Sequence, residues 1–131
     1  MANPNIVAVS AIYGTTTYLT PSGTSSVVLL PNPAGSNKVF KIESIIVANS
    51  NTSSAVNATV AIYTDGSVAQ GSAPSGGTAY PIASTVSIPA NASLFVIDKT
   101  NGFYLQEGTS IIVTSSLASQ LTFTVSYEDI S

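Results

Sequence analysis

Residues 121–128, Leu-Thr-Phe-Thr-Val-Ser-Tyr-Glu, alternate apolar and polar side chains without a break. Successive side chains of a β-strand point to opposite faces, so this period of two is typical of a strand with one buried face. Elsewhere β-branched and aromatic residues dominate the apolar positions, and residues that favour helices are scarce. We find no amphipathic helical pattern. The chain is therefore predicted to be all-β.

Eight or nine short strands are expected, because the apolar segments are separated by turns rich in Gly, Pro, Asn and Ser. The expected strands are 6–13, 15–20, 26–30, 38–49, 55–64, 93–98, 103–105, 109–116 and 121–128. The last two are interpreted as a hairpin joined through 117–120, and the Gly- and Pro-rich segment 65–78 as a loop. This spacing predicts an antiparallel β-sandwich, with a jelly-roll as one candidate wiring.

The length of 131 residues fits one β-sandwich domain, 1–131. Residues 1–15 allow two interpretations. Ile6 to Tyr13 forms the first strand of the domain's own sheet, or residues 1–15 form an N-terminal arm that adds to the sheet edge of a neighbouring molecule. The ordinary strand is the simpler hypothesis.

Only 7% of the residues are charged, and the chain contains three Lys, no Arg, no His and no Cys. The missing imidazoles and thiols exclude a histidine base, a cysteine nucleophile and His/Cys zinc sites. Three lysines are too few to follow a phosphate backbone, so nucleic acid is not an expected partner. No cofactor is predicted.

The six carboxylates offer little for catalysis or metal binding. Asp98 and Glu107 flank the short strand 103–105 and are the one pair that could meet at an end of the sandwich. The loops that contain Asp98 and Asp65 carry too few oxygen ligands for calcium, and turn formation explains both aspartates. We therefore expect no catalytic residue, no metal site and no enzyme.

The N-terminal sequence has no basic residue and no long apolar run, so no secretory signal is expected. No segment reaches the roughly 18 apolar residues of a membrane helix, so no membrane partner is expected either. Tyr13, Tyr18 and Tyr80 lie near expected turns and could be exposed. A carbohydrate-binding β-sandwich module that uses these tyrosines is one alternative function.

Three C-terminal segments carry a family resemblance. They are Ser87-Ile88-Pro89-Ala90-Asn91-Ala92-Ser93-Leu94-Phe95-Val96-Ile97-Asp98-Lys99, Phe103-Tyr104-Leu105-Gln106-Glu107-Gly108-Thr109-Ser110-Ile111 and Ser126-Tyr127-Glu128-Asp129-Ile130-Ser131. In this order they resemble small virion structural proteins of tailed bacteriophages, particularly those of cyanobacterial hosts, over residues 40–131. Thr109 departs from the acidic Glu-Gly-Asp turn of that family and makes a cation site there less credible.

The resemblance implies a β-sandwich that is present in many copies on a virion, is made in the host cytoplasm and has no catalytic residues. It is most consistent with a capsid decoration (cement) protein, and a neck, tail or fibre accessory protein is the alternative. The implied partners are the major capsid protein, other virion proteins and further copies of the chain, with a trimer favoured by analogy.

The scarcity of charge also favours assembly, because Ser and Thr make up more than a quarter of the chain and hydroxyls cost less to bury than charges. The expected interface comprises the N-terminal segment, two tyrosines and the glycine-rich loop. These residues are Ile6, Val7, Ala8, Val9, Tyr13, Tyr18, Gly66, Gly71, Gly76 and Gly77.

Overall fold

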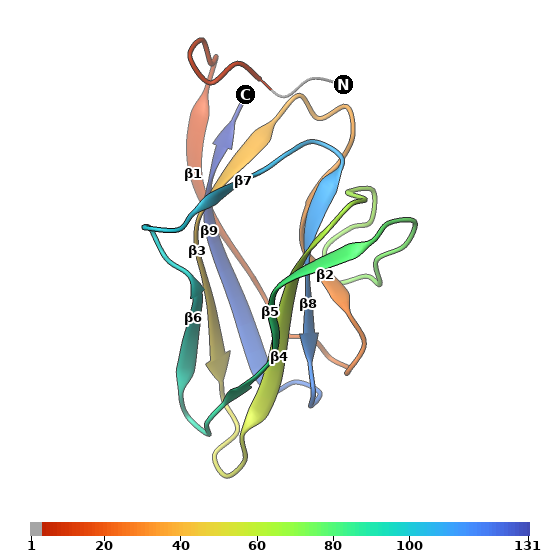
Figure 1. Ribbon diagram of the computed structural model, residues 1–131, viewed down its shortest axis with the longest axis vertical. Coiled ribbons are helices and arrows are strands. Elements are labelled where there is room, and N and C mark those ends of the chain that lie inside the picture. The colour runs from red at the N-terminus through yellow and green to blue at the C-terminus, as the bar shows by residue number, and fades with distance from the viewer. Residues whose placement is uncertain (1–3) are drawn as a thin grey trace.

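A computed structural model describes residues 4–131, which form two antiparallel β-sheets packed face to face (Figure 1). The strands are β1 (Ile12–Leu19), β2 (Val27–Asn32), β3 (Val39–Asn49), β4 (Val56–Tyr63), β5 (Ala79–Ile88), β6 (Ser93–Ile97), β7 (Phe103–Leu105), β8 (Thr109–Ser115) and β9 (Leu121–Ile130). Sheet A has the order β1-β9-β3-β6, with β7 also paired to β3, and sheet B has the order β2-β8-β4-β5. The predicted antiparallel β-sandwich of eight or nine strands is confirmed, with nine strands.

The wiring is that of a jelly-roll. Strands β6 and β7 both pair with β3, opposite residues 45–48 and 40–42 respectively, so they are one strand interrupted at 98–102. Each sheet then has four strands, and every connection except β4–β5 and β6–β7 passes from one sheet to the other. Two four-stranded sheets wired in this way define the jelly-roll class.

The predicted hairpin between β8 and β9 is wrong. Both segments are strands, but β8 lies in the middle of sheet B and β9 in the middle of sheet A. The connecting residues 116–120 cross the end of the sandwich, where the backbone N–H of Ser119 donates to the carbonyl oxygen of Pro21 at 2.8 Å. A four- or five-residue connection can reach the opposite sheet about 10 Å away, so its length alone does not identify a hairpin.

The boundaries of several other strands also differ from expectation. The predicted strands 6–13 and 15–20 are replaced by the single strand β1, which runs without interruption through Gly14. Ile6 and Val7 form a turn in which the Asn5 side chain accepts a hydrogen bond from the Val7 N–H. Strand β5 was not expected, and β2 continues through Pro31. Residues 1–3 of the expected arm lie outside the described residues.

The core lies between the two sheets and is formed by alternate residues of each strand. Leu121, Phe123 and Val125 are completely buried, as the alternation along residues 121–128 predicted. Facing them from sheet B are Leu29, Val56, Val60, Ile111 and Val113, and β3 adds Ile42, Ile45 and Val47. Burial of these side chains stabilises the sandwich, at about 25 cal/mol per Å² of apolar surface.

Two buried asparagines hold opposite ends of the sandwich. The Asn32 side chain donates to the carbonyl oxygens of Lys38 and Leu105, each at 3.0 Å. Asn49, at the end of β3, donates to the carbonyl oxygens of Ser54 and Ile88 at 3.1 and 2.9 Å. Each side chain therefore ties a connecting loop to a strand of the other sheet, and its hydrogen bond to that strand is buried.

Candidate functional site

The two outer faces of the sandwich differ in charge. None of the four strands of sheet B contains an Asp, Glu, Lys or Arg residue. On the outer face of sheet A, Lys41 and Glu43 lie on β3, and Glu128 lies on β9. Water can therefore be removed from the outside of sheet B without desolvating a charge on any of its strands.

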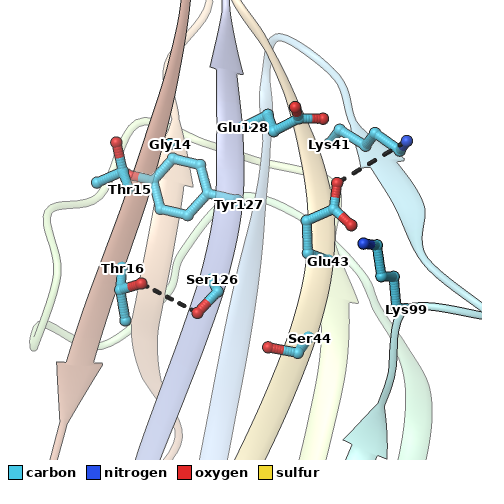
Figure 2. A pocket seen from close by; sticks show the side chains of 10 residues that line it. All are labelled: Gly14, Thr15, Thr16, Lys41, Glu43, Ser44, Lys99, Ser126, Tyr127 and Glu128. Atoms are coloured by element: carbon cyan, nitrogen blue, oxygen red, sulfur yellow. Dashed lines mark hydrogen bonds and ion pairs between the residues drawn. The ribbon is translucent and has the colours of Figure 1, made fainter.

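A groove of about 730 Å³ lies on the outer side of sheet A (Figure 2). Its walls come from β1, β9, β3 and the loop between β6 and β7. The lining residues are Gly14, Thr15, Thr16, Lys41, Glu43, Ser44, Lys99, Ser126, Tyr127 and Glu128. Strand pairing brings these residues together, because Gly14 is opposite Glu128 and Glu128 is opposite Lys41. The expected interface included none of them, since Lys41, Lys99 and Glu128 are far apart in sequence.

The charged groups of the groove are only partly paired. The Lys41 ammonium lies 3.8 Å from a Glu43 carboxylate oxygen, although the residue directly opposite Lys41 is Glu128. Within residues 4–131, the ammonium of Lys99 and the carboxylate of Glu128 make no hydrogen bond or ion pair. The groove therefore presents both a cation and an anion that remain available to a ligand.

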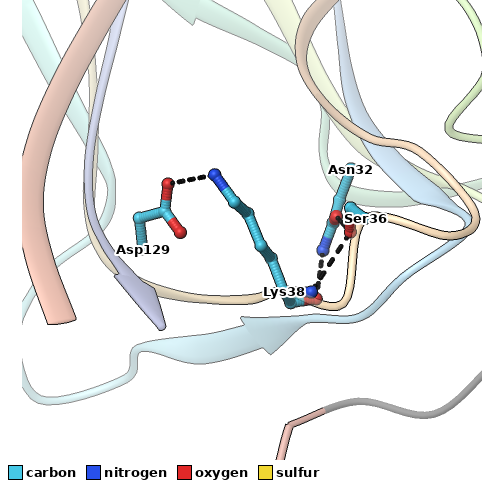
Figure 3. Close-up of polar contacts among 4 residues, drawn as sticks. All are labelled: Asn32, Ser36, Lys38 and Asp129. Atoms are coloured by element: carbon cyan, nitrogen blue, oxygen red, sulfur yellow. Dashed lines mark hydrogen bonds and ion pairs between the residues drawn. The ribbon is translucent and has the colours of Figure 1, made fainter. Parts of the chain in front are cut away.

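A second ion pair lies beside β1, outside this groove (Figure 3). The Lys38 ammonium contacts a carboxylate oxygen of Asp129 at 3.1 Å, next to the Asn32–Ser36 hydrogen bond that orders the turn before β3. The pair borders a cavity of about 330 Å³ whose lining also includes Phe40 and Tyr127. The rings of these two residues pack at 4.8 Å, and burial, with a smaller contribution from the Asp129 charge, raises the pKa of Tyr127.

The glycine-rich loop covers part of the outer face of sheet B and is anchored there. Val68 packs on a second apolar cluster that contains Val28, Ala61, Tyr63 and Ile112. The backbone of Val28 exchanges two hydrogen bonds with the loop, one with the carbonyl oxygen of Ser72 and one with the N–H of Gly71. The loop therefore occupies the free edge of β2.

The residues expected at the interface occupy three different places. Gly71, Gly76 and Gly77 are exposed in the loop over sheet B. Gly66 is buried, and a Cβ at this position would lie 2.3 Å from the carbonyl oxygen of Asn32. Gly66 is therefore a packing position and cannot contact a partner.

The N-terminal segment lies next to the C-terminal end of β9, where the N–H groups of Ser10 and Ala11 donate to the carbonyl oxygen of Ser131. Within this segment Val7 is 91% exposed, while Ile6 and Ala8 are exposed and Val9 is half-buried. The turn thus presents apolar side chains to solvent at one end of the sandwich.

The three tyrosines proposed for carbohydrate binding are all exposed. Tyr13 and Tyr18 lie on β1, an odd number of positions apart, and Tyr80 lies on β5 in the other sheet. Because side chains alternate along a strand, Tyr13 and Tyr18 point to opposite faces. The three therefore do not share one binding surface. Phe95, a strand residue for which the sequence favours core or interface packing, and Tyr104 are exposed aromatics at the other edge of sheet A.

The candidate acidic residues have structural partners. The Asp98 carboxylate accepts hydrogen bonds from the hydroxyl and N–H of Thr100, which lower its pKa. The Asp65 carboxylate is held by Ser67 in the same way, with the same effect on its pKa. The Glu107 carboxylate accepts the N–H of Asn37 at 2.7 Å. In the described part of the chain no three such residues cluster in a way that could hold a metal ion.

Comparison with known proteins gives structural similarities alone. No family model and no curated protein matches the sequence. The chain is similar to a region of a protein in the crystal structure of the T13 viral particle of IBDV, with a TM-score of 0.45 and 8% identity over 94% of this chain and 32% of that one. For infectious bursal disease virus Gt strain, the TM-score is 0.25 and the identity 11%, over 93% of this chain and 31% of the other.

The chain thus spans about a third of these viral proteins and resembles a region of a viral particle protein. Similarity at this level carries no information about activity or partners. In residues 4–131 there is also no helix long and apolar enough to span a membrane.

Proposed function

We propose that this chain is a non-enzymatic structural protein of a virion, and specifically a capsid decoration protein of a tailed bacteriophage. The observation that carries the proposal is the outer face of sheet B, whose four strands have no charged residue. This face is the one that would contact the particle, and the charged outer face of sheet A would remain in solvent.

Side-chain chemistry on sheet B favours such a contact. Asn57 and Ser87 pair across β4 and β5 on the outer side, and Ser26 shares a 2.7 Å hydrogen bond with Thr114. Hydroxyl and amide groups exchange their hydrogen bonds with water for bonds with a partner at small cost, whereas a buried unpaired charge is expensive. The exposed Ile6 and Val7 would add apolar contact area at one end.

The resemblance of residues 40–131 to phage virion proteins supports the same proposal. Under it, the partners are the major capsid protein and further copies of the chain, and the protein resides in the virion. A neck, tail or fibre accessory protein is the alternative that shares this chemistry. Fold alone does not decide between these positions, because the jelly-roll serves many functions.

Three experiments test the proposal. Mass spectrometry of purified particles should detect the chain, and cryo-electron microscopy should place it on the head. Purified chain should also rebind particles that were produced without it. If the chain is absent from purified virions, the proposal is overturned.

A charge placed on each face tests the direction of docking. Ser87→Lys adds a charge to the outer face of sheet B, and Ser93→Lys adds the same charge to an exposed position on the outer face of sheet A. We expect Ser87→Lys to weaken rebinding at least tenfold and Ser93→Lys to leave it unchanged. Equal binding of the two variants would show that sheet B is not the contact surface.

A further inference from the structure

We propose that the groove on the outer side of sheet A is a binding site for a neutral saccharide of one to three sugar units. The groove has a volume of about 730 Å³, which lies within the roughly 300–1,000 Å³ range of small-ligand sites. This inference is independent of the proposed virion role, since it concerns the opposite face of the sandwich.

Charge is the first observation in favour of a site. The whole chain has three basic and six acidic residues, and four of these nine line this groove. They are Lys41, Glu43, Lys99 and Glu128. Charges that served only solubility would be spread over the surface, because like and unlike charges are usually interspersed there. Because the chain has so few charged residues, the presence of four of them in one groove points to a ligand.

The charges also indicate what kind of ligand fits. Two cations and two anions cancel, so the groove has no net attraction for a strongly acidic or basic molecule. The unpaired Lys99 ammonium can donate to a hydroxyl, and the unpaired Glu128 carboxylate can accept from one. Hydrogen bonds to charged groups are about twice as strong as neutral ones. A ligand with many hydroxyls and no charge uses both kinds of group.

The shape of the groove depends on Gly14. This glycine has no heavy atom within 4 Å of the position where a Cβ would lie, so it leaves open space between β1 and the Glu128 side chain. The aromatic residue that lines the groove is Tyr127, which precedes Glu128 on β9. Strand pairing therefore places Gly14, Glu128 and Lys41 in a row across the groove, and Tyr127 lies beside this row. An aromatic ring beside polar groups suits the mixed apolar and hydroxyl surface of a sugar.

A peptide is the less suitable occupant. Extended peptides gain most of their affinity from backbone hydrogen bonds to an unpaired sheet edge. Of the strands that line the groove, β9 and β3 are paired on both sides and offer a ligand only their side chains, whereas β1 is the edge strand of the sheet. Hydroxyls of Thr16 and Ser126, which are 3.0 Å apart, and of Ser44 provide further side-chain contacts.

The test is a titration of the isotope-labelled protein, followed by NMR chemical shifts. The probes are maltotriose, cellotriose and tri-N-acetylchitotriose, with trigalacturonic acid as the acidic comparator, each to about 20 mM, because millimolar affinity corresponds to only about 4 kcal/mol. We expect at least one neutral trisaccharide to shift the amides of Gly14, Ser126 and Glu128. No shift with any neutral probe, a response confined to sheet B or binding of the acidic probe alone would overturn the proposal.

Variants localise the site. Gly14→Val fills the groove at a position with free space. Lys99→Ala and Glu128→Ala each remove an unpaired charge. Each of the three variants should weaken saccharide binding at least tenfold. Gly23→Val is the matched control, because a Cβ at Gly23 also meets nothing within 4 Å and the residue is not part of the groove. All variants must keep the wild-type amide spectrum away from the substitution. Unchanged affinity in Gly14→Val would refute the site.

Discussion

Replacing the buried Asn32 tests whether its side chain holds one end of the sandwich together (Figure 3). The side chain is fully buried and makes three hydrogen bonds: it donates to the carbonyl oxygens of Lys38 and Leu105 and accepts from the Ser36 hydroxyl at 2.6 Å. At about 1 kcal/mol for each bond, Asn32→Ala should lower the free energy of unfolding by about 3 kcal/mol. The whole free energy of unfolding of a domain this size is only about 5–15 kcal/mol, so the expected loss is a large fraction of it.

Urea unfolding, followed by circular dichroism, measures the effect. With a slope of about 1–3 kcal/mol per molar urea, the midpoint should fall by about 1–3 M. Asn32→Asp keeps the acceptor but loses both donors, and its carboxylate would face two carbonyl oxygens. It should therefore be at least as destabilised as Asn32→Ala.

Asn57→Ala is the control, because the Asn57 side chain makes no hydrogen bond within the described structure. Its midpoint should lie close to that of the wild type. If Asn32→Ala changed the stability by less than about 0.5 kcal/mol, the range typical of surface substitutions, the hydrogen-bond reasoning would be refuted.

Three further predictions concern single positions. Phe123→Ala removes a fully buried ring and should cost about 3–5 kcal/mol in urea unfolding, and a loss under 1 kcal/mol would contradict the placement of the core. Gly66→Ala places a Cβ 2.3 Å from a backbone oxygen, so it should lower thermal stability and shift the loop amides in NMR spectra; a wild-type spectrum would argue against this contact. Thr100→Val removes the hydroxyl that lowers the pKa of Asp98, so an NMR titration should show this pKa rising toward 3.8. Because the folded pKa is depressed, the Thr100 contact stabilises above the unfolded pKa and is lost as the pH falls through the folded pKa; no change in the titration would refute the assignment.

The sequence was informative about strands and less so about their partners. Alternation over Leu121 to Glu128 identified β9 and its buried face, because that pattern depends only on local geometry. Which sheet the strand joins depends on contacts with β1 and β3, which are distant in sequence. The number of expected strands equals the number observed, but the individual strands differ. Two expected strands are the single strand β1 in the structure, and β5 was not expected. Pro81 and several small polar residues gave the β5 segment the composition of a loop.

The residues of the groove could not be identified from the sequence for the same reason, because they come together only through contacts between distant segments. Gly14 was interpreted as a break between strands, whereas in the structure its missing side chain opens the groove inside β1. Lys41, Lys99 and Glu128 are absent from the interface expected from the sequence, and no sequence motif connects them. Their convergence follows from the register of three strands and one loop, which no local pattern encodes.

The central positions of β8 and β9 dictate when the protein can fold during synthesis. Strand β9 separates β1 from β3, and β8 separates β2 from β4, so neither sheet can close until residues 109–130 have left the ribosome. Until then, β1 and β2 have no strand to pair with, and the apolar surface of the nascent chain is exposed to chaperones and to other nascent chains. A nascent chain that stops before residue 109 therefore lacks the central strand of each sheet and can complete neither of them.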